Sequence, residues 1–92
     1  MKTIPETIRT VEVPNEGLIA LLNQNVLIFC VNYFYYGKLV GVNDTCIKIE
    51  NCYIIYETGS FAEDNFKDKQ LLAPEWYVQK SAIESFGKST KN

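Results

Sequence analysis

The chain contains no histidine, and this absence removes the side chain that most often serves as a general base near neutral pH. It also has only 3 cysteines, which lack the close pairing that a zinc site needs. Cys30, Cys46 and Cys52 each lie inside an apolar stretch, so we interpret them as reduced, buried thiols. We therefore expect no enzyme activity, no metal and no cofactor.

Positive charge and long apolar runs are scarce as well. Lysine and arginine number 9 against 11 acids, and the net charge of -2 argues against a protein that binds phosphates over its whole surface. Any nucleic-acid contact must then be local. No apolar run approaches the roughly 18 residues of a membrane span, and the first residues lack the hydrophobic core of a signal peptide. We expect a cytosolic protein without a membrane partner.

Apolar side chains, by contrast, are abundant. Hydrophobic residues make up 47% of the chain and aromatic residues 13%, within a length of 92 residues. This length predicts a single domain, spanning 1–92, and a domain this small can bury only part of its surface. The chain has more apolar side chains than such an interior holds, so we expect it to associate with copies of itself.

The N-terminal part predicts one short helix. Asn15 can cap the free amides of a first turn, and Leu18, Leu21 and Leu22 then share one apolar face. The pattern ends in a polar run, so the predicted helix covers residues 15–23.

Residues 26–57 are rich in β-branched and aromatic side chains with short polar interruptions, which predicts a meander of three strands. Gly37 and Gly41 fall inside the second strand and favour a strongly curved strand. The apolar side chains of the third strand change parity near Asn51, so we predict a bend or bulge there.

The remainder is less regular. Residues 58–75 are mostly polar and predict a variable surface excursion, two short closing strands follow within 76–86, and 87–92 predict a loose tail. Five short strands also occur in other SH3-like barrels and in OB barrels. OB folds usually place their helix between the third and fourth strands, whereas Sm-like folds place it first, and the excursion is long enough to contain a helix.

This order of elements, together with two short motifs, resembles the Sm-like family. Gly37 and Leu39 stand where the first motif of that family has Gly-x-Leu, and its Asp, Met and Leu are replaced by Asn43, Cys46 and Ile49. Residues 78–80 followed by Ala82 and Ile83 resemble the second motif, with Gln79 for its Arg and Lys80 for its Gly. The resemblance implies an all-β fold, a small five-stranded, strongly bent Sm-like (SH3-like) barrel with a short N-terminal helix.

Within the family the chain looks most like divergent Sm-like proteins of phages and marine metagenomes, which would place it in the host cytoplasm. The resemblance implies a homo-oligomeric ring, of roughly five to seven subunits, that binds RNA or single-stranded DNA and acts in nucleic-acid processing. Sm-like proteins that hold uridine use an Asn of the first motif and the Arg of the second. Here Ile47 occupies the Asn position and cannot hydrogen-bond a base edge, and Gln79 brings no charge.

The candidate site residues follow from this reading. The expected phosphate contacts are Lys38, Lys48 and Lys80, and the expected base contacts are Tyr36 and Gln79. The expected subunit interface lies on the closing strands, at Trp76, Tyr77, Val78 and Ile83. Two other functions stay open: a ring scaffold or adaptor for protein partners, and a binder of small nucleotides at the subunit clefts.

Overall fold

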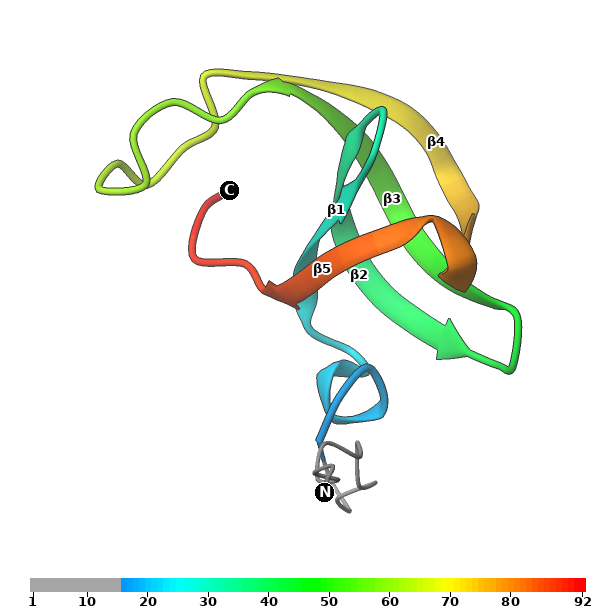
Figure 1. The fold of residues 1–92 in the computed structure, drawn as a ribbon. Coiled ribbons are helices and arrows are strands. Elements are labelled where there is room, and N and C mark those ends of the chain that lie inside the picture. The colour runs from blue at the N-terminus through cyan, green and yellow to red at the C-terminus, as the bar shows by residue number, and fades with distance from the viewer. Residues whose placement is uncertain (1–15) are drawn as a thin grey trace, which may run out of the picture.

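The computed structural model describes residues 16–92, which form one antiparallel sheet of five strands (Figure 1). A 3-10 turn, η1 (Ile19–Leu21), precedes the first strand, and a second one, η2 (Lys80–Ala82), joins the last two strands. The strands are β1 (Asn25–Cys30), β2 (Phe34–Val42), β3 (Cys46–Glu57), β4 (Asp68–Gln79) and β5 (Ile83–Lys88). The predicted all-β fold with a bent five-stranded sheet is confirmed.

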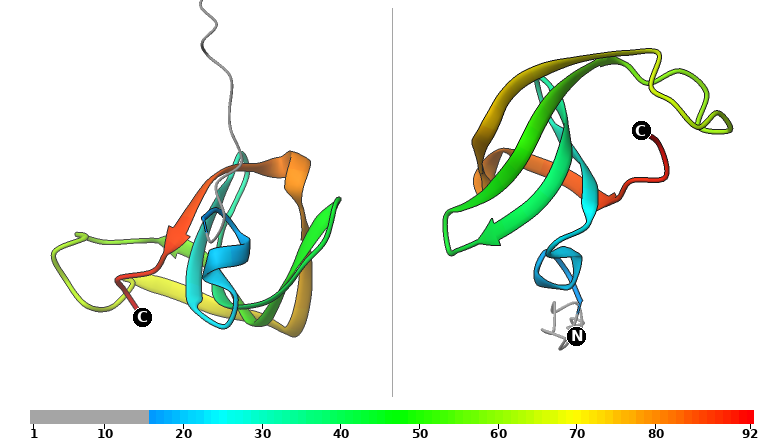
Figure 2. Two further views of the ribbon diagram at one scale, coloured as in Figure 1. Left: turned by 90° about the horizontal axis from the view of Figure 1, so that it is seen from below. Right: turned by 180° about the vertical axis from the view of Figure 1, so that it is seen from behind.

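The sheet curls because β4 and β5, which follow each other in the chain, lie at its opposite edges. Its order is β4-β3-β2-β1-β5, so the two edge strands are β4 and β5, and only the short η2 connects them. A connection of three residues cannot cross a flat sheet, since each residue spans at most about 3.6 Å. The sheet must therefore bend until its edges approach each other, as the two views of Figure 2 show.

The pairing of β2 with β3 is irregular at Gly37, where the two backbones come close together. The register between these strands shifts between Tyr36 and Lys38, on either side of Gly37. A Cβ atom on Gly37 would lie 2.5 Å from the Ile49 Cγ2 atom and 2.9 Å from the Asn51 carbonyl oxygen. Asn51 itself has a left-handed φ of 52°, and the β3–β4 register shifts just after it, between residues 52 and 53. The predicted bend near Asn51 is present.

Both faces of the sheet carry a core, which explains why β1 is apolar on both of its sides. The main core fills the inside of the barrel, and the partly buried leucines of the N-terminal turn pack against it. A smaller second core covers the other face. The main core contains Val26, Ile28, Cys30, Leu39, Ile47, Ile49, Cys52 and Val78, and the second core contains Leu27, Tyr36, Ile55 and Phe66.

The helix predicted over residues 15–23 is reduced to the single 3-10 turn η1. Gly17 and Asn23 have positive φ angles of 79° and 69°, and Leu22 is already extended, so an α-helix cannot continue on either side. Asn15, the expected cap, lies outside the described residues. Leu18, Leu21 and Leu22 do pack on the main core, because one turn suffices to bring them to the same face.

Strand β4 begins earlier than the sequence pattern predicts, at Asp68 instead of Trp76. Its first half lies on an edge of the sheet, mixes exposed with partly buried residues and lacks a regular apolar alternation, but it pairs with β3 as far as Asp68 opposite Glu57. The excursion is thus only 58–67. Within the described chain this segment contains turns and no helix, which excludes the OB arrangement.

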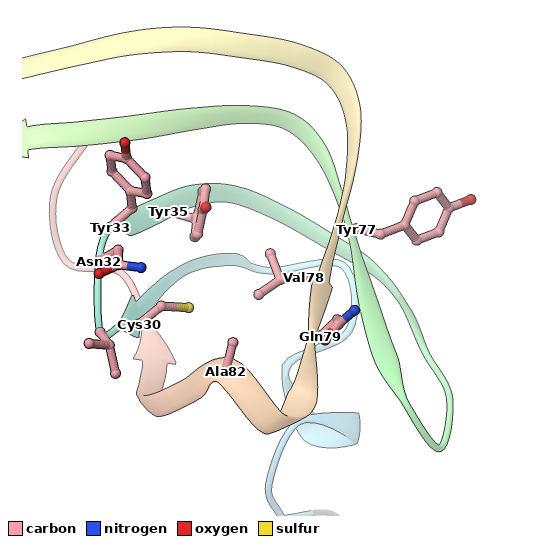
Figure 3. A pocket seen from close by; sticks show the side chains of 9 residues that line it. Cys30, Asn32, Tyr33, Tyr35, Tyr77, Val78, Gln79 and Ala82 are labelled. Carbon is pink, nitrogen blue, oxygen red and sulfur yellow. The ribbon is translucent and has the colours of Figure 1, made fainter.

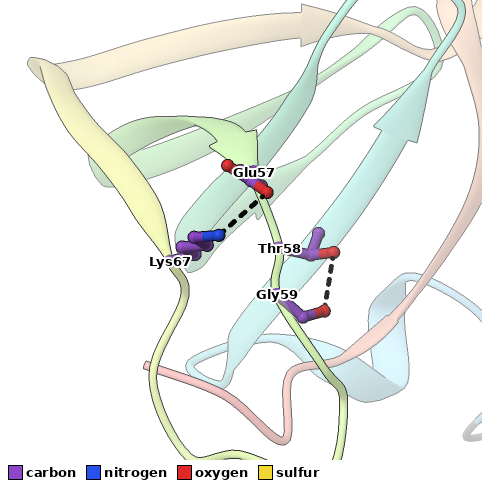
Figure 4. A network of polar contacts seen from close by, with 4 residues as sticks. All are labelled: Glu57, Thr58, Gly59 and Lys67. Carbon is purple, nitrogen blue, oxygen red and sulfur yellow. Dashed lines mark hydrogen bonds and ion pairs between the residues drawn. The ribbon is translucent and has the colours of Figure 1, made fainter.

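The 58–67 excursion is fixed at its base by polar contacts (Figure 4). The Glu57 carboxylate lies 3.4 Å from the Lys67 ammonium, and the Thr58 hydroxyl donates to the Gly59 carbonyl. Both charged side chains are exposed, so this ion pair contributes at most about 1 kcal/mol.

The segment 87–92 is not the loose tail that its composition predicts, because Lys91 is 2% exposed.

We predict that Gly37→Ala destabilises the protein by about 2–3 kcal/mol, because the added methyl group meets backbone carbonyls that cannot move aside. Urea unfolding followed by circular dichroism measures this loss. Gly87→Ala is the matched control, because a Cβ atom there meets nothing within 4 Å, and we expect its effect to stay within about 0.5 kcal/mol. Equal effects of the two substitutions would contradict the close approach at Gly37.

We also predict that the buried thiols resist alkylation. Burial raises the pKa of Cys30, and it raises the pKa of Cys52 to about 12, so both thiols stay protonated where an exposed thiol ionises. Cys46 is only partly buried and should react first with iodoacetamide, as read by mass spectrometry.

The buried Cys52 thiol should also make stability depend on pH. Since Cys52 ionises near pH 9 in the unfolded chain, the free energy of unfolding should fall as the pH rises from about 9 towards 12. Rapid alkylation of Cys52 in the folded chain would disprove its burial.

Candidate nucleic-acid interface

The two motif segments meet at one end of the barrel. Register places Cys46, at the start of β3, opposite Gln79, at the end of β4. The backbone N–H of Lys80 then donates to the Thr45 carbonyl across 2.8 Å. The β2–β3 turn and the β4–β5 connection are therefore joined directly, although they are far apart in the sequence.

Asn43 shapes the β2–β3 turn. Its side-chain oxygen accepts hydrogen bonds from the backbone N–H groups of Thr45 and Cys46, each across 2.9 Å. This is the local bonding by which asparagine favours turns. The residue therefore has a structural role in the turn, and its amide oxygen is already engaged.

A depression of about 620 Å³ lies between the two loops. Its lining includes Ser81, Gln79 and Lys80, whose side chains are of types that hydrogen-bond to a base edge or a phosphate. Thr45 also lines it, but its hydroxyl already donates to the Asn43 side-chain oxygen across 3.3 Å. One lysine and one aspartate face it, so a single copy attracts phosphate only weakly. The lining consists of Asp44, Thr45, Cys46, Tyr77, Gln79, Lys80 and Ser81.

Only some of the predicted contact residues come together here. Gln79 and Lys80 line the depression. Lys48 adjoins it through Tyr77, because its ammonium lies 5.8 Å from the centre of that ring and 3.6 Å from a carboxylate oxygen of Glu75. Lys38 is exposed on β2, away from the loops, between Asn25 on β1 and Glu50 on β3.

Tyr36 is not at the surface. It is 7% exposed and its ring packs edge-on against Phe66, with centroids 5.2 Å apart. The tyrosine belongs to the second core, which leaves no ring face for a base. Ile47, at the position of the family's base-binding Asn, is completely buried in the main core.

The predicted interface residues divide between surface and interior. Trp76 and Tyr77 are 39% and 61% exposed on the edge strand β4. Val78 is buried, and Ile83 packs against the main core, so these two support the barrel itself. The sequence reasoning missed Leu71 on β4 and Phe86 on β5, which are exposed apolar residues on the same two edge strands. Consecutive residues of a strand face opposite sides, so one of the adjacent pair Leu71 and Leu72 had to be exposed, and the structure shows that it is Leu71, since Leu72 packs on the main core.

A second cavity, of about 360 Å³, opens between the β1–β2 turn and the end of β4 (Figure 3). The side chains of Cys30, Val78 and Ala82 point into it, whereas Tyr77 points away. Asn32 and Tyr33 lie at its edge, and none of the residues from 16 to 92 that line it is charged. Burial and neighbouring Cys30 raise the pKa of the Tyr35 hydroxyl, which is therefore neutral at physiological pH.

Two further properties bear on the class of protein. Within residues 16–92, no group of three or more acidic or cysteine side chains is placed to hold a metal ion. No helix in this part of the chain is both long and apolar enough to cross a membrane.

No protein-family model matches this sequence, and no curated protein matches it significantly. Among solved structures, the chain is similar to an Sm protein of Pyrococcus abyssii, solved in complex with a uridine heptamer. The likeness covers 85% of this chain and 100% of that chain, with a TM-score of 0.60 at 12% sequence identity. At this identity the likeness establishes the architecture alone. The chain therefore has an Sm-like fold.

Proposed function

We propose that this protein is an Sm-like subunit that binds RNA or single-stranded DNA in the depression between its β2–β3 and β4–β5 loops. The observation that carries the proposal is the Lys80–Thr45 backbone bond, which joins the two motif segments and holds Gln79 and Lys80 beside the β2–β3 turn. The Pyrococcus abyssii Sm protein, which shares the fold, was solved with a uridine heptamer. This chain has no enzymatic role in the proposal.

The edges of the sheet support assembly into a homo-oligomeric ring. Strands β4 and β5 each have one unpaired side, and exposed apolar residues lie along both. Pairing the β4 of one copy with the β5 of the next satisfies these backbone groups, and a closed ring ends the growth. In a ring of roughly five to seven copies, each subunit places one Lys80 around the ring axis. A nucleic acid that contacts several subunits then binds more tightly than it binds one weak site.

Base selectivity should differ from that of uridine-binding Sm proteins. Ile47 is buried and apolar, so no side chain at that position reads a base edge. Gln79 offers both donors and acceptors and suits several bases. We therefore propose that the protein contacts mainly the sugar-phosphate backbone of the nucleic acid and accepts several different bases.

The biological setting remains part of the proposal. We propose a role in nucleic-acid processing in the cytoplasm of a phage-infected host, on the strength of the motif resemblance to phage and metagenome Sm-like proteins.

A ring scaffold for protein partners is the second candidate. It is favoured by the single lysine in the depression, which Asp44 offsets, and by the overall charge of -2. A ring of this kind would have the same subunit contacts but would bind no oligonucleotide.

We predict that short oligonucleotides bind with strong salt dependence and that Lys80→Ala weakens binding by roughly tenfold or more. Fluorescence anisotropy with labelled oligo-U and oligo-A measures this, and the two should bind within about threefold of each other. Lys67→Ala is the charge-matched control, because Lys67 is exposed on the excursion and pairs with Glu57. Equal weakening by both substitutions, or no binding by the unchanged protein, would refute the proposed site.

We predict that native mass spectrometry finds one closed oligomer and that Trp76→Lys shifts it towards smaller species. The reason is that Trp76 is exposed on an unpaired edge, where a neighbouring copy would have to desolvate the new charge. Tyr56→Lys serves as the control, because Tyr56 is also exposed but lies on the interior strand β3. A purely monomeric protein would remove the ring from the proposal.

A further inference from the structure

Lys91 is the one charged side chain among the buried residues of the described chain. Its backbone follows β5 and turns back towards the 58–67 excursion, so that the chain end at residue 92 lies beside that loop in Figures 1 and 2. Burying an ammonium group is costly unless polar groups replace its water. The surroundings of Lys91 therefore have to compensate for that loss.

The compensation comes from a cage in the excursion. The Lys91 ammonium donates to the backbone carbonyl of Ser60 across 2.5 Å and to that of Glu63 across 2.8 Å. It also lies 5.5 Å from the ring centre of Phe61 and 5.8 Å from that of Phe66, within the range of cation–π attraction. Its neighbourhood thus combines two neutral acceptors with two aromatic rings.

Backbone pairing fixes the same segment against the loop. The Phe66 N–H donates to the Asn92 carbonyl across 2.9 Å, and the Asn92 N–H donates to the Asp64 carbonyl across 2.8 Å. The Ser89 hydroxyl also donates to the Lys91 carbonyl across 2.7 Å, which orients the lysine. The 89–92 segment and the excursion therefore hold each other in place.

These contacts matter for the second core. Phe66 belongs to the excursion, and its ring packs on Tyr36 of β2 to close that core over the outer face of the sheet. The main core on the inner face does not include any residue of 58–67. The excursion can thus lift away from the sheet without disrupting the barrel.

We propose that Ser60, Phe61, Glu63 and Phe66 form a binding site for a primary ammonium group, which Lys91 occupies within the same chain. Occupancy latches the 58–67 excursion over the second core, and an empty site releases it. The site recognises the ligand by its charge and by two of its N–H donors, since carbonyl dipoles and ring faces both favour a cation. This inference is independent of nucleic-acid binding and of the ring.

Hydrogen exchange of the full chain, read by mass spectrometry, tests the latch. Lys91→Met keeps an unbranched side chain of nearly the same length and removes the charged nitrogen, and we expect the amides of 58–67 to exchange roughly tenfold to a hundredfold faster. Exchange in β1 to β3 should stay slow. Lys88→Ala is the matched control, since Lys88 carries the same charge but is exposed on β5. Unchanged exchange of 58–67 in Lys91→Met would overturn the latch.

Chemical rescue tests the ammonium site itself. Lys91→Ala leaves room for the lost carbons and nitrogen, which n-propylammonium matches in length and charge. We expect n-propylammonium chloride to restore slow exchange in 58–67, and sodium chloride of equal ionic strength or n-propanol to have no effect. Failure of n-propylammonium to slow exchange, or equal rescue by n-propanol, would show that the cavity does not select an ammonium group and would overturn the assignment.

Discussion

The rest of the structure depends on one topological constraint, the short connection between strands at opposite edges of the sheet. Because η2 is three residues long, β4 and β5 can both pair with the meander only if the sheet closes on itself. The backbones of β2 and β3 come close together at Gly37, and only a residue without a Cβ atom fits there. The β4–β5 connection lies against the β2–β3 turn for a different reason, because β4 pairs with β3 and its last residue, Gln79, lies opposite Cys46.

A bent sheet has an inner and an outer face, and this protein covers both. The inner face is filled by strand residues and by the leucines of the N-terminal turn. The outer face is covered by a surface loop, which the 89–92 segment secures through a caged ammonium and paired backbones. The two cores differ in kind: the inner one follows from closure of the sheet, whereas the outer one is held by contacts that can open locally.

Much of the fold could be read from the chain because it follows from local patterns. β-branched and aromatic runs mark the strands of the meander, and the change of parity at Asn51 marks a real bend, since a left-handed residue there reverses the facing. The early start of β4 could not be read, because an edge strand with exposed faces needs no apolar alternation. The helix predicted over residues 15–23 is longer than the observed turn for a similar reason. Leucines spaced three and four residues apart fit a single turn as well as a helix of three turns.

The sequence by itself determined the three strands of the meander, the turns between them and that Ile47 cannot hydrogen-bond a base, because side-chain chemistry and local backbone preference act over a few residues. Tertiary structure alone decided that Tyr36 lies in the core while Trp76 is exposed, that Gln79 and Lys80 share a depression, and that Lys91 is buried in a cage. These outcomes depend on strand register and on the meeting of distant segments, where a shift of one residue exchanges the two faces of a strand. A lysine in a polar tail carries no local sign that carbonyls and rings some thirty residues away will replace its water.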